Sequence, residues 1–319
     1  MRWRRGGAGA AAAVGAVLML AGCSADPVRD YVDRSVEILD QGLYADTPEW
    51  AEAVDRMRPE LYAKDSIPET YAGIGELGRV AGGDHAFLID PAAVVAMARA
   101  AAPEATFPVP SVSTTAGIST VTLPSFNGQE QEAIDRYQDA GVAAVRSAAP
   151  ATTCGWIVDL RTNRGGNAYP MLSSVGPLLR DGHVLGFQYR DGRTSWIDVE
   201  NGAVVPPAGI DDGTAAAGFS IDQPVAVVTG PLAASAAETV VVAFAGQADT
   251  VRVGEPTAGL TTANDVFDLP DGARIALSVA FYVDRGGTVY DGPIAPDITH
   301  ASSPATVLDA AADWLRARC

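Results

Sequence analysis

The second half of the chain carries a strand-like run, a turn of small residues and a helix-like run in succession. Residues 224–229 are apolar, as in a buried strand, and residues 231–244 (PLAASAAETVVVAF) start with small residues and continue as an apolar helix. Such a turn can hold an exposed serine, here Ser235, beside the N–H groups of the first helical turn, which point toward an anion. The tetrapeptide from Ser235 to Glu238 is equally typical of a helix capping box. A nucleophile and a helix cap therefore both fit this stretch alone.

Strand-like and helix-like segments alternate along most of the chain, which favours an α/β core. The strand-like runs are residues 86–89, 117–126, 155–160, 184–189, 194–199, 224–229, 250–253 and 274–283. The helix-like runs are residues 91–102, 129–148, 168–179, 235–244 and 304–318. Residues 203–218 are rich in Gly, Pro and Ala without periodicity and are expected to form a loop. No internal repeat is visible.

The region before this core reads as helical. Residues 26–43 are amphipathic, Thr47-Pro48 is a typical helix start, and a third helix is expected to begin near Ser66 and end at the Gly82-Gly83 pair. We therefore expect a helical cap over residues 23–82 and an α/β catalytic core over residues 83–319.

Residues 1–22 are predicted to be a lipoprotein signal peptide. Arg2, Arg4 and Arg5 form a basic start, residues 10–20 are apolar but too short for a typical membrane span, and the run ends in Leu-Ala-Gly-Cys23. In a lipobox of this kind the chain is cut before Cys23, which is then lipidated; the other interpretation is an ordinary secretory signal with a chance cysteine. We expect a chain anchored by lipid on the extracytoplasmic face of a membrane.

Composition narrows the ligand classes. The formal net charge is −17, which argues against nucleic acid as a partner. No His/Cys cluster has metal-ligand spacing, so neither a metal nor a cofactor is expected. Cys154 and Cys319 could pair in an oxidising compartment, but the sequence does not show their distance. It does not indicate the oligomeric state either.

A second stretch, residues 158–167, runs from a buried strand through a polar turn into a glycine pair. Gly165 and Gly166 can bring unobstructed N–H donors close to a substrate, which is what an oxyanion hole requires. A plain strand-to-helix turn is the alternative. Asp159 and Arg161 are expected to pair with each other and fix the loop.

Serine chemistry near neutral pH needs a base whose pKa is close to 7, and histidine is the usual one. The chain has three histidines, at positions 85, 183 and 300. His85 follows a glycine pair just before a strand, where its side chain can be held at the edge of a cleft. His183 resembles a residue of a surface turn, and His300 lies near the C-terminus.

Four stretches together resemble the tail-specific (C-terminal processing) protease superfamily in order and approximate spacing. They are residues 159–167, residues 224–238, residues 253–259 (VGEPTAG) and residues 296–298 (PDI). The resemblance implies a crotonase/Clp-protease-like α/β core with serine peptidase activity and, here, no inserted peptide-binding (PDZ) module.

Two positions indicate the branch of that superfamily. Leu260 stands where the classical members carry their catalytic lysine, and Lys64 is the only lysine of the mature chain. The turn Gly83-Asp84-His85-Ala86 instead resembles the tricorn-core and nisin-resistance-protein branch, in which a histidine is the base. Ala86 departs from that branch, where a small hydroxyl residue commonly follows the histidine.

The resemblance implies roles for individual residues. Ser235 is the nucleophile and His85 the base, and the N–H of Ala236 forms the oxyanion hole with that of Gly165 or Gly166. Asp291 or Glu238 is the acid that orients His85.

The sequence thus predicts an extracytoplasmic, lipid-anchored serine endopeptidase that cleaves extended peptides or protein tails. A non-catalytic peptide- or ligand-binding lipoprotein on the same fold is the alternative. Acyl-CoA chemistry of the crotonase type is disfavoured, because its cofactor is cytoplasmic and this chain carries a secretion signal.

Overall fold

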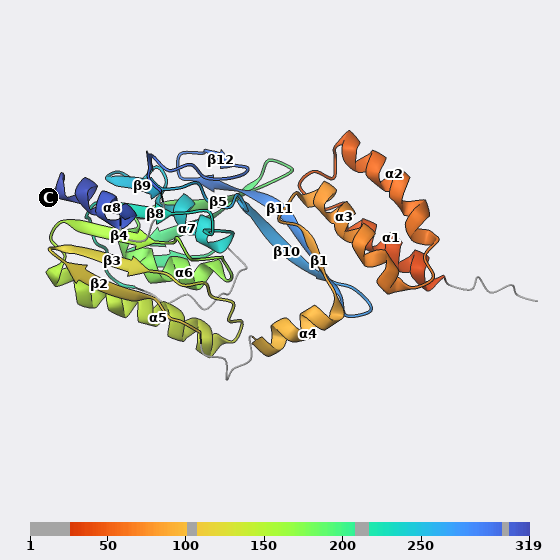
Figure 1. Ribbon diagram of the computed structural model, residues 1–319, viewed down its shortest axis with the longest axis horizontal. Coiled ribbons are helices and arrows are strands. Elements are labelled where there is room, and N and C mark those ends of the chain that lie inside the picture. Colours follow the sequence, from red (N-terminus) through yellow and green to blue (C-terminus); the bar gives the residue numbers. More distant parts are fainter. Residues whose placement is uncertain (1–25, 101–106, 208–216, 302–305) are drawn as a thin grey trace, which may run out of the picture.

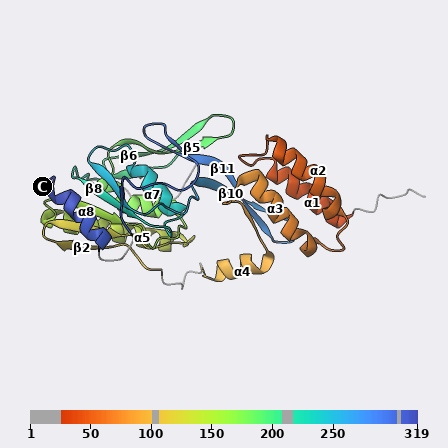
Figure 2. The ribbon, with the colours of Figure 1, turned by 45° about the horizontal axis from the view of Figure 1, so that its top comes forward.

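The computed structural model describes residues 26–100, 107–207, 217–301 and 306–319. Its two ends differ: an α/β core lies at one end and three helices at the other, and strands β1, β10 and β11 join them (Figure 1). A view turned by 45° shows the same arrangement (Figure 2). The predicted lipidation site, Cys23, and the signal peptide lie outside the described residues.

The core is built on a six-stranded sheet in the order β13-β9-β8-β4-β3-β2. Its strands are β2 (Ser111–Thr115), β3 (Ile118–Thr122), β4 (Gly155–Asp159), β8 (Val225–Thr229), β9 (Thr250–Gly254) and β13 (Ile298–Thr299). Strands β4 and β8 are parallel neighbours at the centre and are buried along their whole length. Their continuous apolar sequences suit strands that are covered on both faces.

Helices cover both faces of this sheet. On one face, α5 (Gln131–Ala148), α6 (Ala168–Val175) and α7 (Ala236–Phe244) pack in the main hydrophobic cluster of the molecule. On the other, α8 (Thr306–Arg316) packs on side chains of β4, β8 and β9. Short 3₁₀ turns extend α5 at Ala149–Ala151 and α6 at Gly176–Leu178.

A second sheet holds β1 (Phe87–Ile89), β5 (Gly182–Tyr189), β6 (Thr194–Glu200), β7 (Ala203–Val205), β10 (Thr262–Asp268), β11 (Arg274–Asp284) and β12 (Val289–Tyr290). Strand β7 corrects the expectation that a loop begins at residue 203, since residues 203–205 pair antiparallel with β6. This three-residue strand is too short to show a period in the sequence.

The helical cap consists of α1 (Pro27–Leu39), α2 (Pro48–Tyr62), a 3₁₀ turn (Ile67–Thr70) and α3 (Tyr71–Gly82). As the sequence predicts, α2 begins after Thr47, whose Oγ1 accepts a hydrogen bond from the N–H of Trp50 at 3.3 Å. The cap helices form one hydrophobic cluster with side chains of β11 and of the loop before it, among them Leu269, Ile275 and Leu277. Helix α4 (Pro91–Ala100) follows β1 directly.

Strand β11 belongs to both ends of the molecule. Its first half pairs with β1 and its second half with β5, while β10 runs antiparallel along both halves. Ile275 and Leu277 pack in the cluster of the cap, and Tyr282 packs in the cluster of the core. We call the three strands β1, β10 and β11 the arm.

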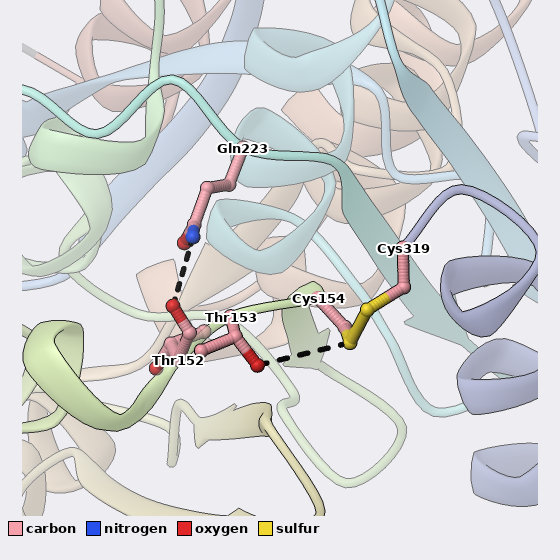
Figure 3. Close-up of a disulfide and its surroundings, with 5 residues drawn as sticks. All are labelled: Thr152, Thr153, Cys154, Gln223 and Cys319. Atoms are coloured by element: carbon pink, nitrogen blue, oxygen red, sulfur yellow. Dashed lines mark hydrogen bonds between the residues drawn. A yellow bond between two sulfur atoms is a disulfide. The ribbon is translucent and has the colours of Figure 1, made fainter.

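Cys154 and Cys319 form a disulfide, which answers the question that the sequence leaves open (Figure 3). The bond fastens the last residue of the chain to the residue that precedes β4. Beside it, Gln223 Nε2 donates to the carbonyl of Thr152 at 2.8 Å. None of the helices in the described ranges combines the length and the apolar character needed to cross a membrane.

Candidate active site

Ser235 lies in the turn between β8 and α7, where the sequence places the nucleophile. Its backbone is in the left-handed region, at φ 53° and ψ −115°. A non-glycine residue adopts such a conformation only where the surrounding structure enforces it, and strained turns of this kind are typical of functional sites. The side chain is half-buried and follows directly after a fully buried strand.

The buried carboxyl group of Glu238 accepts hydrogen bonds from this turn and from the loop after β9. Its Oε2 accepts the N–H of Ser235 at 2.7 Å, and its Oε1 accepts Thr257 Oγ1 at 2.5 Å and the N–H of Gly259 at 2.8 Å. The carboxyl group is fully buried, and burial raises its pKa while these hydrogen bonds act in the opposite direction. Among the described contacts Glu238 reaches the backbone of Ser235 and not the ring of His85.

The glycine pair lies against the same turn. A Cβ on Gly165 would come within 2.7 Å of the carbonyl oxygen of Ala234 and 3.0 Å of Ser235 Cβ, so this close approach requires glycine. The N–H of Gly165 donates to Asn163 Oδ1 at 2.9 Å, so it already has a hydrogen-bond acceptor within the protein. The N–H groups of Gly166 and Ala236 donate to no group in the described part of the chain. Gly166 is also exposed, whereas Gly165 is buried.

Of the three N–H groups that the sequence nominates for the oxyanion hole, two are thus free to bind a substrate oxygen. Ala236 is the first residue of α7, whose N–H has no partner inside the helix. The same helix end adds the favourable dipole for a negative charge.

Asn163 fixes this arrangement and was not singled out from the sequence. It is fully buried, and its Nδ2 donates to the carbonyl of Leu123 at 3.0 Å. Its Oδ1 holds Gly165, and its main-chain carbonyl accepts the N–H of Ala234 at 3.2 Å. The side chain of Asn163 therefore joins the residue after β3 to the glycine turn, and its main chain joins the glycine turn to the serine turn.

His85 lies in the turn before the arm, two residues ahead of β1. Its Nδ1 is 3.1 Å from both the carbonyl oxygen and the Oγ1 of Thr262. Because a carbonyl only accepts, the bond to it requires the proton on Nδ1 and leaves Nε2 free to accept a proton. Burial lowers the pKa of His85, and the hydrogen bond to the Thr262 carbonyl opposes that shift. The main chain is held as well, since Asn264 Nδ2 donates to the His85 carbonyl at 2.7 Å.

Asp291 accepts a hydrogen bond from the hydroxyl of Tyr44 at 3.1 Å. Tyr44 lies in the loop between α1 and α2, and its ring packs edge-on against Phe281 at a centroid distance of 5.9 Å. Burial, followed by the charges of Asp291 and Asp84, raises the pKa of Tyr44 to about 12. Among the described contacts Asp291 thus joins the core to the cap and does not reach the ring of His85.

Ser235 and His85 each lie against a residue of the β10–β11 hairpin. Burial and the charge of Glu238 raise the pKa of Tyr282 on β11 and the nearby Ser235 side chain lowers it, so the two side chains are close to each other. The N–H of Tyr282 donates to the carbonyl of Thr261 at 3.1 Å. The next residue, Thr262, binds the ring of His85. In the described part of the chain no hydrogen bond links the serine and histidine side chains to each other.

The other sequence-nominated residues lie elsewhere. Arg161 and Asp159 form the expected pair, with Nη2 2.7 Å from Oδ2. His183 is exposed on β5, stacked on Trp196 at 4.6 Å, and His300 binds the neighbouring carbonyl of Ala301. No group of three or more His, Cys, Asp or Glu residues in the described ranges is arranged to hold a metal ion.

Known proteins share both the sequence pattern and the fold. The chain is 26% identical over 295 residues to the nisin-resistance protein of Lactococcus lactis subsp. lactis, covering 90% of this chain and 87% of that protein. A lipoprotein from Streptococcus agalactiae superposes with a TM-score of 0.75 at 24% identity, covering 92% of this chain and 97% of the other. The photosystem II D1 C-terminal processing protease gives a TM-score of 0.63 at 15% identity, covering 91% and 97%.

These likenesses confirm the predicted superfamily and its nisin-resistance-protein-like branch, together with the mixed α/β protease fold. Residues 117–300, which include the glycine pair and Ser235, match Peptidase family S41. The chain therefore belongs to peptidase family S41.

Proposed function

We propose that this peptidase is a serine endopeptidase in which Ser235 attacks the substrate and His85 is the general base. The observation that carries the proposal is the left-handed backbone of Ser235 at the start of α7, beside two uncommitted N–H groups. A serine that only caps a helix ordinarily keeps an extended backbone and needs no glycine turn packed against it.

The proposed reaction begins with the Ser235 hydroxyl directed toward His85 Nε2. The serine oxygen then attacks the peptide carbonyl while its proton passes to Nε2. The N–H groups of Gly166 and Ala236 stabilise the negative oxygen of the tetrahedral intermediate. His85 next gives the proton to the leaving amine, and it later deprotonates the water that hydrolyses the acyl-enzyme.

In this proposal the carbonyl of Thr262 orients His85, in the place where many serine proteases use a carboxylate. A carbonyl fixes the same tautomer, because it accepts the Nδ1 proton. Glu238 instead positions the nucleophile, because its buried carboxyl group accepts the N–H of Ser235.

We further propose that the mature chain begins at a lipidated Cys23 and acts outside the cytoplasm on peptides or unfolded protein tails. The signal-like residues 1–22 support this location. The name of the Lactococcus relative makes nisin the first peptide to test.

The experiment is cleavage of nisin and of unstructured peptides by residues 24–319, followed by mass spectrometry. Ser235→Ala and His85→Ala should each abolish cleavage while the folded structure, followed by circular dichroism, is retained. His183→Ala is the matched control and should cleave as the wild type does. Full activity of His85→Ala would overturn the assignment of the base, and full activity of Ser235→Ala that of the nucleophile.

A further inference from the structure

The arm has one face buried by the cap and one face exposed. Leu88, Ile275 and Leu277 point to the side of the cap and belong to, or pack against, its hydrophobic cluster. Side chains alternate along a strand, so their neighbours lie on the opposite face. There Phe87 is 46% exposed and Val266 is 58% exposed.

These two residues lie in one row across the three strands. Phe87 on β1 and Val266 on β10 both pair with Ala276 of β11. Directly paired residues of antiparallel strands project to the same side. Ala276 is small and only 4% exposed, so it forms the floor between two larger apolar side chains. We call Phe87, Ala276 and Val266 the arm face.

The arm face continues into the candidate active site. His85 precedes Phe87 by two residues, and Asn264, which binds the His85 carbonyl, precedes Val266 by two residues and pairs with Ser278. Two residues of an extended strand span about 7 Å. The apolar row is thus the next row along the arm from the pair of Asn264 and Ser278, and Asn264 holds the main chain of the proposed base.

The far end of the arm face is polar. In the next row Arg274 pairs with Ile89 and Asp268, and its Nε lies 2.8 Å from Asp268 Oδ1. The exposed apolar side chains Phe87 and Val266 thus lie between the pair of Asn264 and Ser278 on one side and a row with the ion pair of Arg274 and Asp268 beside Ile89 on the other.

From this placement we propose that the arm face binds an apolar side chain of an extended peptide substrate, about two residues from the bond that is cut. The proposal rests on the proposed function, because the peptide is the occupant that must lie beside His85. It names a substrate preference: a residue such as Leu, Ile or Phe at one position near the cleavage site. Exposed apolar rows of this kind mark binding sites more often than isolated exposed residues do.

The test separates binding from cleavage. Peptides that carry either Leu or Ser at each of three positions on both sides of the cleaved bond are bound to Ser235→Ala protein and followed by fluorescence anisotropy. We expect one position at which Leu binds roughly tenfold more tightly than Ser, as a few buried methylene groups provide. Phe87→Ser and Val266→Ser, each added to Ser235→Ala, should bring that ratio close to one.

Val205→Ser is the matched control, since Val205 is 37% exposed on a strand at the far edge of the same sheet. It should keep the full preference for Leu. Phe87 and Val266 are both exposed, so the two variants should fold, which thermal unfolding verifies.

A preference for Leu that survives both arm-face substitutions, or the lack of any preferred position, would overturn the inference while leaving cleavage by Ser235 intact. If both substitutions remove the preference for Leu but the wild-type protein cleaves none of the peptides, the arm face is a peptide-binding site and the proposed function is refuted. A dimer in sedimentation that Phe87→Ser converts to a monomer would also overturn the inference, because a second copy would then cover the face.

Discussion

Replacing Asn163 by alanine tests whether one buried amide holds the site together. The change removes the donor to the Leu123 carbonyl and the acceptor for the N–H of Gly165. The Leu123 carbonyl and the Gly165 N–H would then lose this partner at a site where Asn163 is fully buried. Each buried group left without a partner costs about 1–3 kcal/mol, so the two groups together should cost about 2–6 kcal/mol in the free energy of unfolding.

The same substitution should also reduce activity, because it frees the glycine turn beside Ser235. A misplaced oxyanion donor costs about 10²–10³ in rate. Urea unfolding of residues 24–319 measures the first effect, and kcat/KM on a cleaved peptide the second.

Asn167→Ala is the matched control, four residues further along the same turn. Asn167 caps α6 by accepting the N–H of Tyr169 at 3.3 Å and does not touch Gly165. Loss of such a cap costs about 1 kcal/mol, with activity close to that of the wild type. The reasoning fails if Asn163→Ala unfolds within 1 kcal/mol of this control and cleaves as fast.

Three other measurements probe separate features. Because burial lowers the pKa of His85 from the ordinary 6.5, the neutral base persists to lower pH, and kcat/KM should fall only below pH 6.5; an acid limb centred above that value would contradict this. Replacing Cys154 and Cys319 by serine removes a crosslink between residues 165 positions apart. Because the unfolded chain then gains conformational entropy, the free energy of unfolding should fall by about 5 kcal/mol. Urea unfolding against the wild type measures this, and an unchanged midpoint would refute it. Tyr44→Phe removes the hydroxyl bound to Asp291 at a solvent-exposed site and should cost about 1 kcal/mol or less, whereas Tyr44→Ala also loses the ring contact and should cost more in the same assay.

Local patterns were enough to predict the parts of the site that form within one stretch of chain. The turn around Ser235 is predictable because two apolar runs, those of β8 and α7, lie on either side of a short stretch of small residues. The pairing of Arg161 with Asp159 was predictable for the same reason, since the two residues are neighbours on one turn.

The supporting residues could not be found this way, because their partners are distant in sequence. Asn163 binds a carbonyl 40 residues away, and Thr262 binds a histidine 177 residues away. Strand β10 was also missed: its sequence, TANDVFD, mixes small and acidic residues, and it is a strand because β11 supplies the partner along its whole length. Tertiary pairing outweighs weak strand propensity there.

The strand shared by cap and core also determines which pieces of the molecule can be exchanged with a relative. The helices over residues 27–82 complete their hydrophobic cluster with Leu269, Ile275 and Leu277, almost two hundred residues further along the chain. A chimera joined only at residue 82 would place foreign helices on a surface shaped for the original ones. The transferable unit is the three helices together with the β10–β11 hairpin, so this architecture tolerates exchange of both segments together, with one junction after residue 82 and one on each side of the hairpin.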